Sequence, residues 1–335
     1  MSLAVSVIVP TFNRAALIGQ TIDSILAQTA PPAEVIVVDD GSTDDTAALI
    51  RRYGAPVRYH RVKDREGGNI GPSAARNVGV SLAASPWIAF CDSDDLWLPS
   101  KLERQLHLHT LCPTVEFSFT DSTYFSPDQW EDSPLFTRAP AGFWEPQRRC
   151  VHGTIWLYEI SLYDRVIRFQ PALVSTLLMS KRRFERLGGY DERFSKGLCE
   201  DLEFALRNLG DPPIGVLAEP LVRIRRHDAN RSLDLFGLWM GQVRIFEHAL
   251  AAHSAAQPFA SLVRDELQRK RTFAAARAFS SGRLDTVREL APLIEKRYQD
   301  WKLRLRIAIA KLPMPLARLA QRSLVAVNRC LTKLI

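Results

Sequence analysis

The chain has 335 residues, of which 46% are hydrophobic and 24% charged, a balance typical of an ordinary globular protein. Its net charge of +7 at first suggests a polyanion binder, but the basic excess lies at one end of the chain. Residues 297–335 hold nine basic residues and one acid, a net charge of +8, which leaves −1 on residues 1–296. The body of the protein is therefore not expected to bind nucleic acid.

Several other classes of protein are also disfavoured. No uncharged apolar run reaches the roughly 18–20 residues that a membrane-spanning helix needs. Residues 1–5 place no basic residue ahead of an apolar stretch, so a secretory signal peptide is not expected. The five cysteines are scattered without a CxxC pair, which argues against a disulfide framework or a zinc site. We therefore expect a cytoplasmic protein in a reducing compartment.

Short β-branched runs alternate with helical patterns over the first hundred residues. The runs predict buried strands at residues 5–9 and 35–38, a third, weaker strand at 57–60 and a fourth strand at 87–90. Asn13 and Ser42 are expected to cap helices after the first two strands, and Ser73 is expected to start a third helix. This alternation predicts an α/β fold with a Rossmann-like, mostly parallel sheet flanked by helices. In such sheets ligands bind beyond the carboxyl ends of the strands.

Two acidic clusters follow strands of the predicted sheet. Asp39 and Asp40 end the second strand, and residues 92–95 (Asp-Ser-Asp-Asp) follow the fourth. Either cluster alone is explained by a turn, but the fold brings both to one edge of the sheet. If the fourth strand continues through Asp94, the side chains of Asp92 and Asp94 point to the same face. Two such carboxylates suit a hard divalent cation that also binds a phosphate-bearing substrate.

Common phosphate-binding loops are absent from the sequence. It contains neither a GxGxxG fingerprint nor a GxxxxGK[ST] loop. The Gly-rich residues 66–71 are only a weak phosphate signal by themselves. A bound diphosphate would therefore be held by a metal and by scattered polar groups.

Several ordered segments resemble glycosyltransferase family 2, nucleotide-sugar enzymes of the GT-A fold. The segments are residues 5–14 (VSVIVPTFNR), 37–44 (VVDDGSTD), 71–79 (GPSAARNVG) and 90–99 (FCDSDDLWLP). Two later segments, LGGYDERF at 187–194 and CEDLEFALR at 199–207, are similar to the family's GG(F/Y)DE and ED motifs. The resemblance fades between about 111 and 170 and ends after about 232.

The resemblance implies a donor site at the strand ends. Pro10, Phe12 and Asp40 would line the base and ribose pocket, and Asp39 would support the turn. Core packing is the alternative for Phe12, which stands where the family often has Tyr, and a helix-surface position is the alternative for Arg76. The nucleotide-sugar-binding residues implied in full are Pro10, Thr11, Phe12, Asn13, Asp39, Asp40, Arg76, Asp92 and Ser93.

The resemblance also implies a metal site and a catalytic base. Asp94 and Asp92 would hold Mn²⁺ or Mg²⁺, and His227 would complete the metal or diphosphate site unless it belongs to a surface basic cluster. Glu200 and Asp201 would be catalytic, with Asp201 as the general base that deprotonates an acceptor hydroxyl. The helix dipole alone would also favour these acids in a first helical turn.

These features predict an inverting, metal-dependent glycosyltransferase that moves a sugar from a nucleoside-diphosphate sugar, with UDP expected, to an acceptor hydroxyl. The resemblance implies bacterial surface polysaccharide or glycolipid synthesis, with a glycan or lipid-linked acceptor. A sugar nucleotidyltransferase is one alternative, but residues 10–13 lack its Gly-rich signature. A non-catalytic carbohydrate- or membrane-binding protein on the same fold is another, and the intact acidic motifs argue against it.

We expect a GT-A catalytic domain at 1–232, with a nucleotide-sugar half at about 1–110 and an acceptor half at about 111–232. A helical extension would follow at 233–335, ending in a basic amphipathic tail at 297–335. On a helical wheel the tail's apolar and basic side chains occupy opposing sides. A helix docked on the protein's own core and a peripheral helix on the inner face of the cytoplasmic membrane both fit this pattern. The apolar residues are Leu312, Leu316, Leu319, Val327, Leu331 and Leu334, and the basic ones Arg318, Arg322, Arg329 and Lys333.

Overall fold

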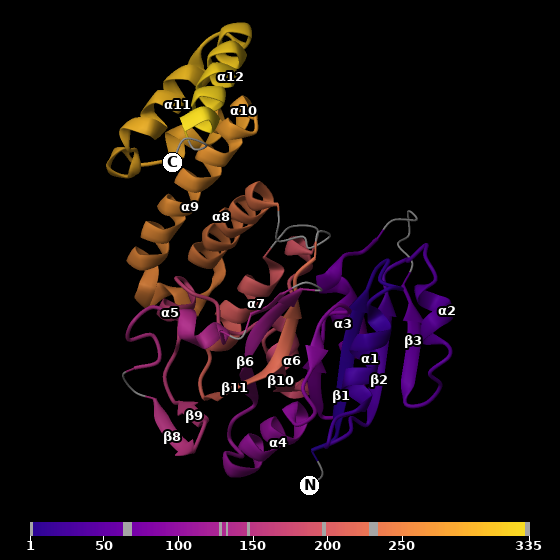
Figure 1. Cartoon of the computed structure of the whole chain (residues 1–335). Coiled ribbons are helices and arrows are strands. Elements are labelled where there is room, and N and C mark those ends of the chain that lie inside the picture. The colour runs from indigo at the N-terminus through magenta and orange to yellow at the C-terminus, as the bar shows by residue number, and fades with distance from the viewer. Residues whose placement is uncertain are drawn as a thin grey trace. The chain divides into compact units, whose positions relative to one another are not determined.

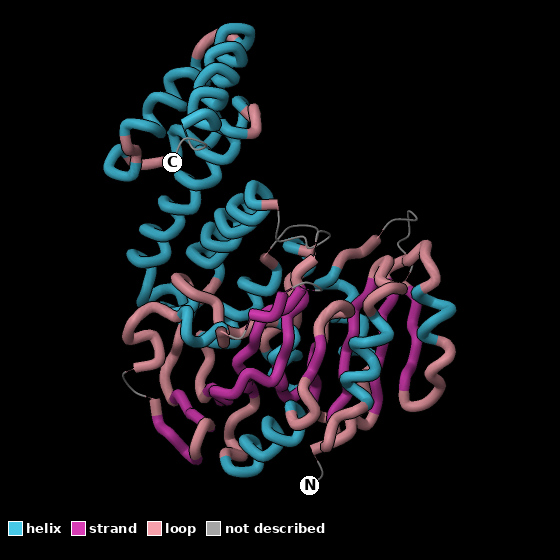
Figure 2. Tube along the Cα trace, in the orientation of Figure 1, coloured by secondary structure: helices cyan, strands magenta, loops and turns pink. Residues whose placement is uncertain are grey.

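A computed structural model describes residues 3–62, 69–126, 129–131, 133–145, 148–195, 199–227 and 234–331, with side chains omitted at 129–131 and 326–331. The chain divides into two compact units, residues 1–230 and 231–335. The first is a sheet with helices on both faces, and the second is helical throughout its described residues (Figures 1 and 2). Three sequence features fall partly outside these ranges: the Gly-rich loop at 66–71, the segment after Ser195, and residues 228–232.

Four parallel strands form the N-terminal half of the sheet, in the order β3-β2-β1-β4. The buried β-branched side chains of β1, β2 and β4 pack on both faces, as the continuous apolar runs predict, whereas the edge strand β3 is partly exposed. The sheet order and the crossover helices confirm the predicted fold class. The strands are β1 (Val5–Thr11), β2 (Glu34–Asp39), β3 (Val57–Arg61) and β4 (Trp87–Phe90).

The sheet continues through strands of mixed direction. β10 (Leu177–Ser180) lies antiparallel between β4 and β6 (Phe117–Ser126), and β11 (Ile214–Arg225) runs parallel to β6. The carboxyl ends of β6 and β11 therefore lie at the same edge as those of β1, β2 and β4. Four short strands complete the sheet: β5 (Leu96–Trp97), β7 (Gln129–Glu131), β8 (Arg149–His152) and β9 (Ile155–Tyr158).

Helices cover both faces of this sheet (Figure 1). On one face, Ile18, Ile22 and Ile25 of α1 are fully buried at helical spacing against the valines of β1 and β2. On α3, a Cβ at Gly79 would lie 2.3 Å from Cγ2 of Ile8, so this helix packs directly on β1. The helices are α1 (Ile18–Leu26), α2 (Thr46–Ile50), α3 (Pro72–Leu82), α4 (Lys101–Leu111), α5 (Tyr163–Val166), α6 (Lys181–Arg186) and α7 (Glu200–Leu209).

Two predicted helix caps and one strand extension are wrong. Neither Asn13 nor Ser42 caps a helix, because they hydrogen-bond across the loops that follow β1 and β2. The fourth strand ends at Phe90 and does not continue through Asp94. A turn replaces the strand, and in it the Asp95 N–H donates to the carbonyl of Asp92 at 3.1 Å.

The second unit is built from five α-helices in its described residues. Their shared core is rich in alanine, which lets the helices approach closely, and it includes Ala274, Ala278, Leu303 and Ala317. None of the described helices is long and apolar enough to span a membrane. The helices are α8 (Leu235–Ala252), α9 (Ala260–Ser280), α10 (Leu284–Leu290), α11 (Trp301–Lys311) and α12 (Met314–Leu331).

Candidate functional site

The two aspartates at the end of β2 hold the neighbouring turns. Asp39 is fully buried and accepts the Ser42 N–H at 2.7 Å and the Tyr59 hydroxyl at 2.6 Å. Burial and this carboxylate raise the pKa of Tyr59 to about 12. Asp40 accepts the backbone N–H groups of Ile70 at 2.7 Å and Gly71 at 2.8 Å, just ahead of α3. Both aspartates therefore shape the edge of the site through backbone groups.

The loop after β1 presents an aromatic ring to solvent. Pro10 and Thr11 are buried, but the Phe12 side chain is 42% exposed, which excludes core packing as its role. The next residue, Asn13, has φ +51°, and its side chain accepts the Thr43 N–H at 2.8 Å. This contact joins the loops after β1 and β2, so the exposed Phe12 ring lies on a fixed backbone.

Asp95 anchors the acidic turn to two distant parts of the chain. Its side chain accepts the Ser175 hydroxyl at 2.5 Å and the Arg225 N–H at 3.0 Å. The Ser175 hydroxyl oxygen in turn accepts the Asp92 N–H at 3.0 Å. Burial and the neighbouring aspartates raise the pKa of Asp95 well above its usual range. Asp95 therefore positions the turn, and Ser93 within it is also buried.

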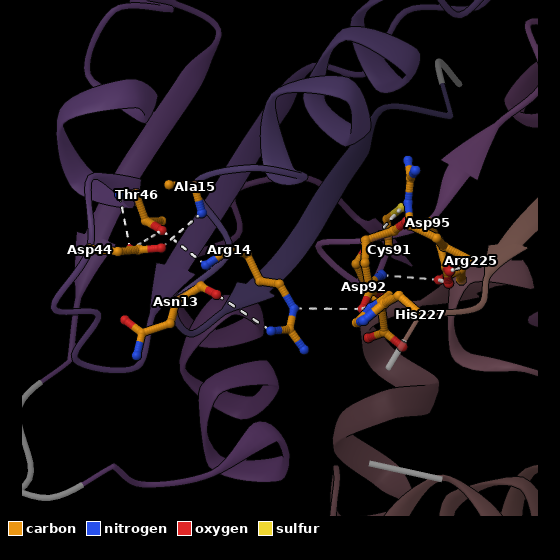
Figure 3. A network of polar contacts seen from close by, with 12 residues as sticks. Asn13, Arg14, Ala15, Asp44, Thr46, Cys91, Asp92, Asp95, Arg225 and His227 are labelled. Atoms are coloured by element: carbon orange, nitrogen blue, oxygen red, sulfur yellow. Dashed lines mark hydrogen bonds and ion pairs between the residues drawn. The ribbon is translucent and has the colours of Figure 1, made fainter. Parts of the chain in front are cut away.

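Asp94 faces two basic side chains from other strand ends. Its Oδ2 lies 3.0 Å from Nε2 of His227 and 3.6 Å from Nε of Arg14. Figure 3 shows Arg14 and His227 approaching the acidic turn from the loop after β1 and from the end of β11. The Arg14 backbone is itself fixed, because its N–H donates to the Thr46 hydroxyl at 3.1 Å, and that hydroxyl donates to Asp44 at 2.6 Å.

The 3.0 Å contact between Asp94 and His227 is a hydrogen bond or ion pair, and two ligands of one cation have a similar separation. Adjacent ligands of octahedral Mg²⁺ stand at about 2.1 Å from the ion and so at about 3 Å from one another. The oxygen and imidazole donors of this pair match that separation, and Mn²⁺ accepts the same donor types. Asp92 is placed differently, because its Oδ1 accepts a hydrogen bond from Arg76 at 2.8 Å. The residues present fit a divalent cation, with Asp94 and His227 as the contacting pair.

A buried arginine joins the acidic turn to α7. Arg76 is 4% exposed, so it is not a helix-surface arginine. Its Nη2 contacts Asp92, its Nη1 lies 3.3 Å from Glu200, and its guanidinium lies 5.0 Å from the centre of the Tyr190 ring. An arginine between two carboxylates neutralises part of the negative charge that the site concentrates at the sheet edge.

Asp201 lies half-buried in the first turn of α7. One carboxylate oxygen accepts the Leu202 N–H at 2.9 Å, and the other accepts the Gln170 side-chain amide at 3.2 Å. Burial raises the pKa of Asp201, while Arg76 and these two hydrogen bonds act in the opposite direction. A carboxylate with a raised pKa is a stronger base than an exposed one, which suits proton abstraction.

Some known proteins are similar to this chain in sequence, and others are similar in fold. Residues 6–167 match the model of glycosyl transferase family 2. The putative teichuronic acid biosynthesis glycosyltransferase TuaG of Bacillus subtilis is 39% identical over 139 residues, which cover 41% of this chain and 53% of TuaG. The chain is therefore similar to glycosyltransferase family 2 over residues 6–167, just under half of its length. An uncharacterised glycosyltransferase of Rickettsia felis is 32% identical over 57% of this chain, and the chain spans about a third of that relative's length.

Solved structures have a fold similar to that of this chain. Residues 1–349 of Staphylococcus aureus TarS in complex with UDP superpose with a TM-score of 0.63 at 19% identity. The match covers 96% of this chain and 90% of that structure. A complex of the same TarS fragment with UDP-GlcNAc gives a TM-score of 0.64.

Several residues of the candidate site are not predicted from the sequence. Arg14 lies within a matching segment, but no role was assigned to it. Gln170 and Ser175 lie at or just beyond the stretch where the resemblance fades, so no motif marks them. Arg225 is the first residue of the basic run that ends at His227. Its contact with Asp95 is made by its backbone N–H, which no sequence motif indicates. Arg14 could have been identified because it is a polar residue in the loop after a predicted strand. Gln170 follows no predicted strand, so no sequence pattern identifies it.

Proposed function

We propose that the protein is an inverting, metal-dependent glycosyltransferase that transfers a sugar from a nucleoside-diphosphate sugar to an acceptor hydroxyl. The observation that carries the proposal is the arrangement around Arg76, which links the acidic turn at Asp92 to the Glu200–Asp201 pair. A cation-binding pair, Asp94 and His227, lies on the same turn. This arrangement supports a site in which the donor phosphates and the acceptor base would lie on adjoining elements.

The donor would lie over the ends of β1, β2 and β4. The exposed Phe12 ring offers a surface for the base, while Asp39 and Asp40 keep the two loops in place. UDP is the nucleotide we expect, because TarS, which has the same fold, binds UDP and UDP-GlcNAc. Pro10, Thr11, Asn13 and Ser93 would border this donor site.

Asp94 and His227 would hold the divalent cation, with Asp92 beside them. When bound, Mn²⁺ or Mg²⁺ neutralises the charge of the departing nucleoside diphosphate. Arg14 reaches the same oxygen of Asp94 and so adds positive charge where the diphosphate would lie. Arg76 instead keeps Asp92 oriented and shields Glu200 from it.

Asp201 would act on the acceptor. Its carboxylate takes the hydroxyl proton as the acceptor oxygen bonds to the anomeric carbon, and the bond from that carbon to the diphosphate breaks. Attack from the side opposite the leaving group inverts the anomeric configuration. Gln170 holds the carboxylate for this step.

The acceptor we propose is a glycan or a lipid-linked glycan of the bacterial cell surface. TuaG, which is named for teichuronic acid biosynthesis, supports this class of product. A lipid-linked acceptor would lie in the membrane, and the basic C-terminal tail would be attracted to the anionic inner face of that membrane.

The test compares Asp201→Asn and Asp94→Ala with Asp285→Asn, a control that changes an exposed carboxylate on α10. We expect Asp201→Asn to lower transfer by roughly 10²- to 10⁴-fold while leaving UDP binding intact. Asp94→Ala should abolish the dependence of UDP binding on Mn²⁺. Product analysis should show a released nucleoside diphosphate, whereas pyrophosphate would indicate a nucleotidyltransferase. Full activity in Asp201→Asn would refute the base assignment.

A further inference from the structure

The amphipathic helix α12 directs two of its leucines, Leu316 and Leu319, away from the core of the helical unit. Ala317 and Gln321 are buried in the helical unit, so this side of α12 faces the core. Leu316 and Leu319 are 55% and 66% exposed, and Leu312 just ahead of the helix is 40% exposed. At 100° per residue these leucines lie about 150° around the axis from the buried side. Met314, Leu324 and Val325 also pack on this core, so Leu316 and Leu319 form a second, outward apolar face of α12.

The preceding helix has the same arrangement. Leu303, Ile307 and Ala310 of α11 are buried in the core cluster that α12 also contacts. On the opposite side, Trp301 is 70% exposed and Leu305 is 41% exposed. We call Trp301, Leu305, Leu312, Leu316 and Leu319 the apolar stripe. Both helices direct their part of the stripe away from the shared core.

The charged residues within the two helices that carry the apolar stripe are all of one sign. No acidic residue occurs between Trp301 and the end of the sequence, whereas eight basic residues do. Lys302 and Arg304 on α11, and Arg318 and Arg322 on α12, are exposed. At 100° per residue the two arginines of α12 lie between its buried side and the apolar stripe. The unit at 231–335 holds 19 basic and 8 acidic residues, a net charge of +11.

This combination favours an anionic lipid surface over a second copy of the chain. A docking face for a second copy would place the basic residues of two molecules against each other, which like-charge repulsion opposes. An anionic bilayer attracts each basic residue near its surface and accepts leucine and tryptophan side chains at the boundary between head groups and acyl chains. Tryptophan is enriched at this boundary, in agreement with the exposed Trp301.

We propose that α11 and α12 form a membrane-binding surface that lies on an anionic bilayer with the apolar stripe inserted. The surface does not depend on the catalytic site and extends the proposed function by assigning a lipid partner to the C-terminal unit. Binding by this surface is reversible and salt-dependent, because it combines shallow insertion with surface attraction.

The experiment is vesicle flotation of the full-length protein, without donor or acceptor. Phosphatidylcholine vesicles are compared with vesicles in which about one third of the lipid is phosphatidylglycerol. We expect flotation only with the anionic vesicles, and less of it at high salt. Leu316→Gln/Leu319→Gln and Arg318→Gln/Arg322→Gln should each lower the bound fraction roughly ten-fold or more.

Two matched controls change similar residues elsewhere on the unit. Leu293→Gln replaces a leucine that is 47% exposed but lies outside the apolar stripe, and Arg264→Gln/Arg269→Gln removes two exposed charges from α9. Both should float like the parent, and thermal unfolding should show that all variants are folded.

Equal flotation of the stripe variants and the parent would overturn the proposal. A dimeric parent that becomes monomeric in Leu316→Gln/Leu319→Gln, as measured by light scattering, would also overturn it. Neither result bears on donor turnover, so the proposed transferase activity is tested separately.

Discussion

At the scale of single residues, the proposed base is controlled by its neighbours. Asp201 accepts hydrogen bonds from Leu202 and Gln170 while burial opposes its ionisation. Hydrogen bonds to the charged form of a carboxyl lower its pKa, and desolvation raises it. For Asp201 the effect of burial is larger, so its pKa stays above the usual range but below the value that burial alone would give.

Replacing Gln170 should move the pH dependence of transfer. Gln170→Leu removes a hydrogen bond to the ionised carboxylate, so the pKa of Asp201 rises further and the acidic limb of kcat/KM shifts to higher pH. Activity is lost most at low pH and recovers as the pH rises. The exposed neighbour Arg168, changed to Gln, should leave the acidic limb in place. A Gln170→Leu profile that matches the parent would show that the amide does not tune the base.

At the scale of elements, the position of α3 determines where two side chains of the candidate site lie. The helix carries Arg76, which contacts both acidic groups, and Asn77, which donates to the Tyr190 carbonyl at 2.9 Å. Gly79 allows the helix to lie directly on β1. The spacing between α3 and the sheet therefore determines where Arg76 lies.

Gly79→Ala tests this spacing. In an exposed helix the change would stabilise by up to about 1 kcal/mol. Here the new Cβ would stand 2.3 Å from Ile8, and overpacking costs about 1–3 kcal/mol, so the protein should be destabilised. We expect a lower midpoint of thermal unfolding together with reduced transfer. Gly54→Ala serves as control, since nothing lies within 4 Å of its Cβ and only backbone strain at φ +62° is added. A stabilised Gly79→Ala variant would contradict the close contact.

Local sequence patterns were sufficient to predict the first four strands, but not the strands β5 to β11 or the tertiary contacts of the loops. The strand ends at Asp39 and Asp92 follow from apolar runs broken by acidic residues, and these runs depend only on neighbouring positions. Asn13 has the residue type of a helix cap, yet a contact 30 residues away to Thr43 decides its role. Gln170 reaches Asp201 across 31 residues in a region without periodicity. Such pairings arise from the tertiary arrangement and leave no mark in a local window.

At the scale of the whole molecule, a buried histidine links stability to pH. His109 on α4 is enclosed by Val115 and Ser118, whose oxygens lie 2.9 Å from its two ring nitrogens. Burial lowers the pKa of His109 to about 4, against 6.5 for an exposed histidine. The unfolded chain therefore binds a proton that the folded protein excludes.

The free energy of unfolding should fall with acidification because of His109. Its contribution is full above pH 6.5 and is lost as the pH falls toward 4, by about 3 kcal/mol. Asp121 acts in the opposite sense, since burial raises its pKa to about 6. The measurement is therefore the difference between parent and His109→Gln in urea unfolding at several pH values. The variant should have the smaller acid loss, and the exposed His107→Gln should not. Equal acid losses in parent and His109→Gln would exclude this histidine as the source.

The anchoring of Asp95 also constrains when the site can form during synthesis. Ser175 and Arg225 lie 80 and 130 residues beyond Asp95 in the chain, and both must be present to satisfy its buried carboxyl group. Contacts between such distant residues form slowly, because long loops must close first. A nascent chain that has completed β1–β4 therefore has most of the recognisable motifs but not the geometry of the acidic turn. The turn reaches its final form only after the ribosome has released β11, so the proposed cation site, which also needs His227, forms late in synthesis.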